Sequence, residues 1–220
     1  GNEAFFLLEH ALIDIGAGVR WLKEYAGIEK IVILGNSGGG SLMGAYQSQA
    51  QGVTMTPTPD FELPEALYDL IPADLYVSLC AHSGRPEVLT SWLDPSITDE
   101  TDPTSIDPEL NMYDEKNGPP YSIEFVKTYR AAQETRNHRI TDWCHGELKR
   151  LESFGMTDRA FNLFRTWADL RLMDGTIDPS QREVGHCYAG NPKRANFGPR
   201  GIGLTNTLRA WLSMWSLKDS

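Results

Sequence analysis

The stretch Ile31-Val32-Ile33-Leu34-Gly35-Asn36-Ser37-Gly38-Gly39 decides the fold class of this 220-residue chain. Its first four residues form a short, continuous and mostly β-branched apolar run. A run without polar alternation predicts a strand that is buried on both faces, as in a parallel sheet. The glycines that follow indicate a tight turn, and Ser41 to about Gln51 is expected to be a helix. This order of strand, glycine-rich turn and helix is typical of a doubly wound α/β unit.

The segments on either side of this unit support the same fold class. Residues 3–26 predict an amphipathic helix, because apolar residues recur at helical spacing and Gly27 lies where a C-cap glycine is favoured. A short helix is expected at Pro64–Leu70. Asp74–Ala81 is the second predicted strand, and it ends at His82.

Beyond this second strand the sequence predicts helices and loops. An acidic loop is expected at Leu93–Pro120, because proline repeatedly blocks helix and sheet there. The predicted helices are Tyr121 to about Phe154, with a break near Gly146, then Arg159–Met173 and, after a loop at Thr176–Gly203, Leu204–Leu217. Two neighbouring strands alone are too few for an independently stable sheet of this type.

The serine in Gly35-x-Ser37-x-Gly39 lies directly after the predicted strand and directly before the predicted helix. A serine at such a sharp turn has a strained backbone and an exposed hydroxyl. A Cβ atom two positions before or after it is expected to collide with the neighbouring strand or helix, so both positions favour glycine. The helix N-terminus brings free N–H groups beside the serine. The pattern indicates a nucleophile, with the N–H of Gly38 placed to stabilise an oxyanion.

These residues resemble the nucleophile elbow of the α/β-hydrolase superfamily. The resemblance covers roughly Phe5–Gln51, and Asp74–Ala81 looks like the next core strand of that fold. It implies an α/β fold, a partial doubly wound parallel sheet of α/β-hydrolase type with a mainly helical lid insertion. The expected boundaries are 1–91 for the core, 92–201 for the lid and 202–220 for a helix that returns to the core. A phosphate-binding loop is disfavoured, because Gly-x-x-x-x-Gly-Lys is absent.

The resemblance implies a serine hydrolase that acts on a carboxylic ester or related acyl bond and needs no cofactor. Ser37 is the expected nucleophile, followed along the chain by an acid and a histidine. Those partners normally follow two later core strands, which this sequence lacks. We therefore expect a truncated family member whose acid and base lie beyond Ser220. The alternative base within the chain is His186, which has Asp174 and Asp178 upstream of it in the correct order.

A second interpretation belongs to another class of protein. The chain would keep the elbow and a lid pocket but no competent triad, and would be a catalytically silent α/β-hydrolase-like binding protein or an inert fragment. His82 and Arg85 are candidate residues of the substrate pocket; the alternative is a loop histidine that only caps or hydrogen-bonds locally. They follow the second strand at the sheet edge where open α/β sheets bind their ligands.

Composition narrows the possible partners. A formal net charge of −10 disfavours nucleic acid and anionic membrane surfaces, both of which require clustered Lys and Arg. Three cysteines are too few for a disulfide framework in a chain of this length, so a cytoplasmic location is the default expectation. The expected partner is a small-molecule acyl substrate, with neither nucleic acid nor membrane. The oligomeric state is unknown.

Other side chains with chemical potential have simpler explanations. Cys144-His145 and His186-Cys187 could pair at a zinc site, but adjacent residues on a helix point in different directions, so no metal is expected. The acidic loop lacks the twelve-residue calcium pattern. The arginines of the lid either pair with carboxylates or bind an anionic substrate group; they are Arg130, Arg136, Arg139, Arg159, Arg165 and Arg171.

Overall fold

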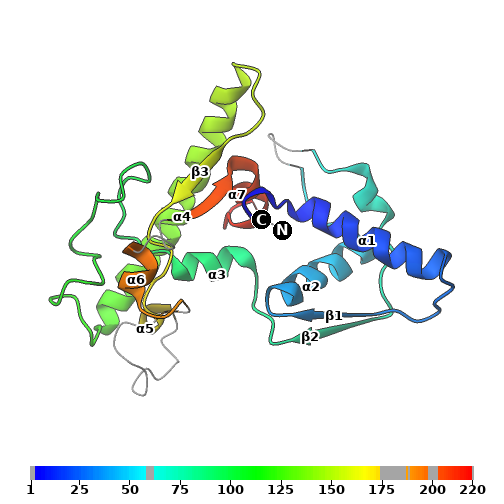
Figure 1. The fold of residues 1–220 in the computed structure, drawn as a ribbon, viewed down its shortest axis with the longest axis horizontal. Helices are drawn as coiled ribbons and strands as arrows, with labels where there is room; N and C mark the ends of the chain where they lie inside the picture. Colours follow the sequence, from blue (N-terminus) through cyan, green and yellow to red (C-terminus); the bar gives the residue numbers. More distant parts are fainter. Residues whose placement is uncertain (1–2, 58–61, 174–186, 188, 198–202, 220) are drawn as a thin grey trace.

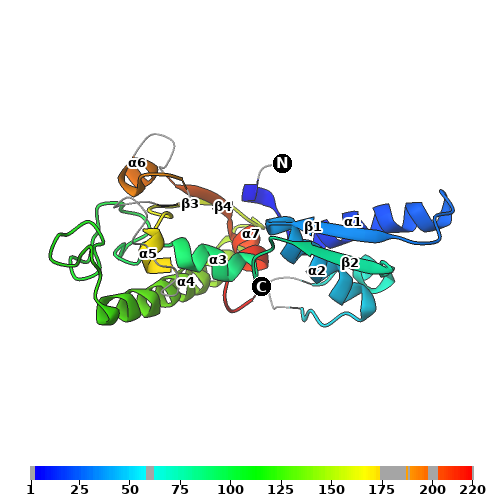
Figure 2. The ribbon, with the colours of Figure 1, turned by 90° about the horizontal axis from the view of Figure 1, so that it is seen from below.

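The chain has a mixed α/β fold that is mostly helical, with a small parallel sheet and a small antiparallel sheet (Figures 1 and 2). A computed structural model describes residues 3–57, 62–173, 187, 189–197 and 203–219. In chain order the elements are η1 (Glu3–Phe5), α1 (Leu8–Glu24), β1 (Val32–Asn36), α2 (Gly38–Gln51), η2 (Glu65–Asp69), β2 (Leu75–Leu79), α3 (Arg85–Trp92), α4 (Ile123–Glu152), β3 (Ala160–Leu163), α5 (Leu170–Met173), α6 (Pro192–Phe197), β4 (Leu204–Thr207) and α7 (Leu208–Met214).

The parallel sheet consists of the two strands that the sequence predicts. β1 and β2 pair in register from Val32 opposite Leu75 to Asn36 opposite Leu79. Figure 1 shows α2 beside this sheet and α1 beyond α2. Tyr46 of α2 is fully buried in the layer, where its hydroxyl donates to the carbonyl of Ile71 at 2.6 Å. The buried residues of this core are Leu12, Val19, Ile31, Ile33, Tyr46, Leu67 and Ala73.

The opposite face of the parallel sheet is exposed. Along β1 the residues alternate between exposed and buried, with Val32 57% exposed and Leu34 56% exposed. Their partners on the same face of β2 include Leu75, which is also more than half exposed. The prediction that this strand is buried on both faces is therefore wrong for the described chain, because both described helices of this layer lie on the other face.

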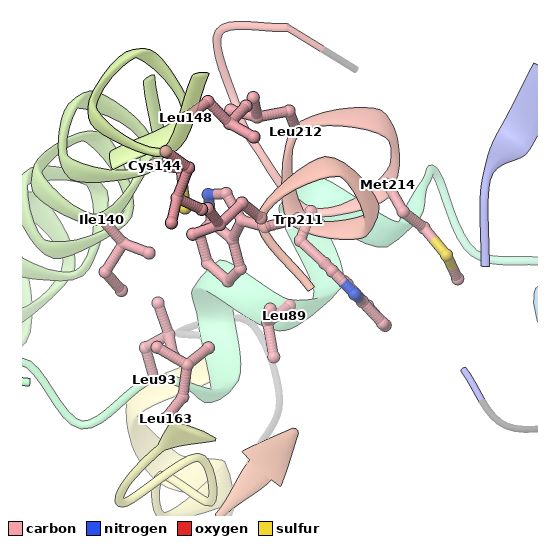
Figure 3. Packing of buried hydrophobic residues seen from close by; sticks show 12 residues of the cluster. Leu89, Leu93, Ile140, Cys144, Leu148, Leu163, Trp211, Leu212 and Met214 are labelled. Atoms are coloured by element: carbon pink, nitrogen blue, oxygen red, sulfur yellow. The ribbon is translucent and has the colours of Figure 1, made fainter. Parts of the chain in front are cut away.

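The described elements from α3 to α7 are arranged around the long helix α4. Ser122 caps its N-terminus by accepting a hydrogen bond from the N–H of Phe125 at 3.0 Å. Figure 3 shows the indole of Trp211, from α7, between residues of α4 and α3. Trp211 is fully buried, and its Nε1 donates to the hydroxyl of Thr141 on α4 at 3.0 Å. The chain's last helix therefore packs against α4.

Helix α4 continues through the position where a break was predicted. Gly146 lies inside the 30-residue helix, and a Cβ there would meet nothing within 4 Å. An interior glycine costs roughly 1 kcal/mol relative to alanine, and packing of α4 against α7 offsets this local preference. The expected boundaries 1–91, 92–201 and 202–220 stay a prediction. Helix α7 contacts both α1 and α4. None of the described helices is both long and apolar enough to cross a bilayer.

The antiparallel sheet lies in segments for which the sequence predicts helix. β3 pairs with β4 from Ala160 opposite Thr207 to Leu163 opposite Leu204. The prediction of one helix over Arg159–Met173 is therefore wrong except in its last turn, which is α5. The prediction of a helix over Leu204–Leu217 is wrong in its first turn, which is β4. Apolar residues at helical spacing also suit a strand when a distant partner is present, and no local pattern shows that partner.

Candidate functional site

The backbone at Ser37 has the strained geometry that the sequence predicts. Ser37 lies between β1 and α2 with φ 53° and ψ −123°, in a region that residues with a Cβ rarely adopt. Its N–H donates to the carbonyl of Leu79 at 3.1 Å, and its own carbonyl accepts from the N–H of Gly40 at 2.9 Å. These bonds join the turn to β2 and to the first turn of α2, so the surrounding structure maintains the strain.

Glycine is required at the turn, but not at every predicted position. A Cβ on Gly35 would lie 2.6 Å from the Cα of Gly40, so no other residue fits there without a backbone shift. A Cβ on Gly39 would meet nothing within 4 Å, and the predicted collision at this position is wrong. The tight position is Gly40, whose Cβ would lie 3.0 Å from the Cα of Ala81 and closer still to its Cβ. The close approach of α2 to the end of β2 therefore depends on Gly40.

The hydroxyl of Ser37 is available for chemistry. Ser37 is exposed, and its side chain does not cap α2. Within the described part of the chain, no hydrogen bond joins its Oγ to a base. Gly38 is the first residue of α2, so its N–H has no acceptor inside the helix. A serine hydroxyl and a helix N–H without an intrahelical acceptor are therefore adjacent at this turn, and no base among the described residues contacts the hydroxyl.

The segment after β2 brings two nitrogen-bearing side chains to Gly38. A Cβ built on Gly38 would lie 2.8 Å from Nη2 of Arg85 and 3.3 Å from Nε2 of His82. Cys80, which has φ 48°, turns the chain after the strand, and Arg85 begins α3. The two predicted pocket residues thus lie beside the residue that follows the predicted nucleophile.

The imidazole of His82 is partly buried and electrostatically disfavoured as a cation. Burial lowers its pKa first, and the nearby charge of Arg85 lowers the pKa further. Its Nδ1 is buried and has no hydrogen-bond partner among the described residues. At neutral pH the ring is therefore uncharged, and Arg85 provides the positive charge beside Gly38.

A cavity of about 460 Å³ opens beside the turn. Gly38 and Gly39 form part of its wall, and Arg85 lines it from the start of α3. The volume lies in the range that binds small molecules. Apolar side chains of α2 and of segments near both ends of the chain also line it: Phe6, Leu8, Leu42, Ala45, Met214 and Leu217. The sequence pattern pointed to Arg85 but carried no local signal for the residues near either end.

None of the other candidate residues that the structure describes lines this cavity. His186, Asp174 and Asp178 lie outside the described residues. Cys144 is fully buried on α4, where burial raises the pKa of its thiol, and His145 contacts Asp219 at 3.1 Å. No group of three or more potential metal ligands occurs among the residues that the structure describes.

Five of the six arginines expected in the lid pair with carboxylates. Arg165 contacts the fully buried Asp94 at 3.2 Å, and Arg136 contacts Glu100 at 2.6 Å. Arg139 also reaches Glu100, while Arg159 pairs with Glu147 and Arg171 with Asp169. The Nε of Arg130 donates to the carbonyl of Leu172 at 3.0 Å. Each of these arginines therefore has a partner within the chain, and an anionic substrate is not needed to explain them.

Comparisons with known proteins leave the site to be interpreted from its own geometry. No family model, curated protein or solved structure matches this chain. The features that carry chemical meaning are the strained serine at the start of a helix, the adjacent free N–H, and a cavity with one arginine beside them.

Proposed function

We propose that the chain carries the nucleophile elbow of an α/β-hydrolase-type serine hydrolase that acts on a carboxylic ester or related acyl bond. The observation that carries the proposal is the backbone of Ser37, with φ 53° between a parallel strand and a helix. A non-glycine residue maintained in this conformation is costly. The strained conformation has a function if it exposes a hydroxyl beside free helix N–H groups.

The proposed reaction is acyl transfer through a covalent intermediate. Ser37 Oγ attacks the acyl carbon while a histidine base takes its proton, and the N–H of Gly38 stabilises the oxyanion. Collapse of the tetrahedral intermediate releases the alcohol, which receives that proton. Water then cleaves the acyl-enzyme by the same route and regenerates the hydroxyl. On this proposal β1, α2 and β2 belong to a doubly wound sheet, and residues 92–201 form its lid.

The second candidate function is a binding protein with the same pocket and no catalysis. Its supporting observation is that the Ser37 hydroxyl has no hydrogen bond to a base within the described residues. General-base catalysis requires such a group within about 3 Å, or one water away, when substrate is bound. His186 remains the candidate base in this chain.

Labelling with a fluorophosphonate probe, located by mass spectrometry, separates the two functions. An activated Ser37 is expected to be labelled, and Ser37→Ala to abolish the label. Ser48→Ala is the matched control, because Ser48 is an exposed serine on the same helix α2. A folded chain that is not labelled at Ser37 would contradict catalysis by this chain and support the binding protein.

A further inference from the structure

Arg85 occupies the space that a side chain at position 38 would fill. Because Gly38 has no Cβ, Nη2 of Arg85 approaches the backbone of the residue that follows Ser37. We propose that Arg85 binds a carboxylate of the ligand, so that the pocket takes acyl compounds with an anionic group and an apolar chain. This inference deepens the proposed function and rests on it for the position of the reacting carbon.

The guanidinium of Arg85 is positioned from behind by an aromatic ring. Its Cζ lies 5.4 Å from the ring centroid of Trp215. Trp215 is 2% exposed, and its Nε1 donates to the side-chain oxygen of Asn206 at 2.9 Å. A planar cation on a fixed aromatic face loses less conformational freedom when it binds a carboxylate. Arg85 is therefore partly preorganised for such a ligand.

The charges around the cavity favour an anion. The first turn of α2 contains no acidic residue, so the positive end of its dipole is not neutralised there. Glu87 is the acidic residue among those described in the cavity wall, and it is exposed to solvent, where its charge is screened. Burial and Arg85 lower the pKa of His82, so its ring can donate or accept a hydrogen bond without adding charge.

The rest of the wall selects an apolar chain. Leu42 and Ala45 of α2 line the cavity together with Met214 of α7 and with Phe6 and Leu8. A volume of about 460 Å³ accommodates a short or medium chain in addition to the carboxylate. The second cavity, of about 450 Å³, is lined by Glu9 and Asp219 in addition to Arg209 and Lys218. Glu9 is buried there, so solvent screens its negative charge little, and this cavity is the less favourable one for an anion.

Equilibrium binding of octanoate and of the neutral octanamide tests the proposal by calorimetry. The wild-type chain is expected to bind octanoate roughly ten- to one-hundredfold more tightly, as for a charge-assisted hydrogen bond. Arg85→Gln should abolish this preference, and Arg85→Lys should retain part of it. Arg150→Gln is the control, because Arg150 pairs with Glu147 on α4. Far-UV circular dichroism verifies that each variant is folded.

The possible outcomes separate this inference from the proposed function. Equal binding of the two ligands by the wild type, or a preference that survives in Arg85→Gln, would overturn the role of Arg85. Binding requires no catalysis, so octanoate selectivity without labelling of Ser37 refutes only the hydrolase. Slower labelling of Arg85→Gln by a neutral fluorophosphonate, together with unchanged octanoate binding, would overturn the proposal and assign Arg85 to the oxyanion.

Discussion

The N–H of Ser37 donates to the carbonyl of Leu79 at 3.1 Å, and Leu79 pairs with Asn36 at the end of the parallel sheet. The hydrogen bonds of β1 and β2 thus extend into the turn that carries the candidate nucleophile. A change in the pairing of the two strands would therefore also move Ser37. This relationship explains why a two-stranded sheet can maintain a strained residue, and it makes the turn sensitive to substitutions at its glycines.

Gly35→Ala is expected to destabilise the fold, because its Cβ would lie 2.6 Å from the Cα of Gly40. Overpacking against backbone is costly, so we expect a loss of about 3 kcal/mol in the free energy of unfolding by urea denaturation. Gly39→Ala is the matched control, since its Cβ would meet nothing within 4 Å. Equal losses in the two variants would show that the turn is looser than the structure indicates.

Ser37→Gly is expected to be more stable than Ser37→Ala by about 1 kcal/mol. Glycine adopts φ 53° without strain, whereas alanine keeps the Cβ that causes it. Both variants lack the hydroxyl, so comparing them isolates the backbone cost. The measurement is the midpoint of chemical denaturation. An alanine variant as stable as the glycine variant would mean that the strain at this turn is small.

Trp211→Ala is expected to cost roughly 3–5 kcal/mol, because removal of a fully buried indole leaves a large cavity between α7 and α4. The hydroxyl of Thr141 also loses its partner. Trp21→Ala is the control, because Trp21 on α1 is 57% exposed and its removal leaves no cavity. Thermal unfolding of both variants checks the prediction, which a similar loss for each would contradict.

Stability is expected to fall in acid partly through Glu147. Hydrogen bonds from Arg150 and Arg159 lower the pKa of Glu147 to about 2. An unfolded glutamate titrates near pH 4.3. The contribution of ionised Glu147 to the free energy of unfolding is therefore fully present above that pH. It is lost as the pH falls towards about 2.

The measurement is the thermal midpoint as a function of pH, from pH 6 to pH 2. Glu147→Gln should flatten the dependence below about pH 5. Glu134→Gln, at an exposed position of the same helix, should leave it unchanged. If the thermal midpoint of Glu147→Gln fell in acid as steeply as that of the wild type, the pairing of Glu147 would be excluded as the cause of the loss of stability.

The pKa of His82 is expected to rise when the charge of Arg85 is removed. Arg85→Gln deletes the electrostatic contribution, but burial remains and keeps the pKa below that of a free imidazole. Proton NMR titration of the histidine ring signals gives both values. Arg150→Gln should not shift the His82 signal. A pKa that does not change in Arg85→Gln would place the guanidinium away from the imidazole.

Much of the site could be predicted from the sequence because its signals are local. The apolar run before Gly35, the serine that follows and the small residues of the next helix are neighbours along the chain. Their spacing sets the strand, the turn and the helix that the structure describes. The strand that ends before His82 was equally visible. The steric role that the pattern predicts for Gly39 belongs to Gly40, because the spacing of the glycines does not show which of them meets the end of β2.

Other features were decided only by tertiary structure. β3 and β4 form where helices were predicted, because each strand finds its hydrogen-bond partner in a distant segment. Gly38 and Arg85 meet because β2 ends beside the start of α2. The sequence by itself determined the strand, the turn at Ser37 and the helix that follows, since the backbone geometry there depends on adjacent residues. The cavity and the surroundings of Arg85 required the folded chain, because packing between residues far apart in the sequence creates them.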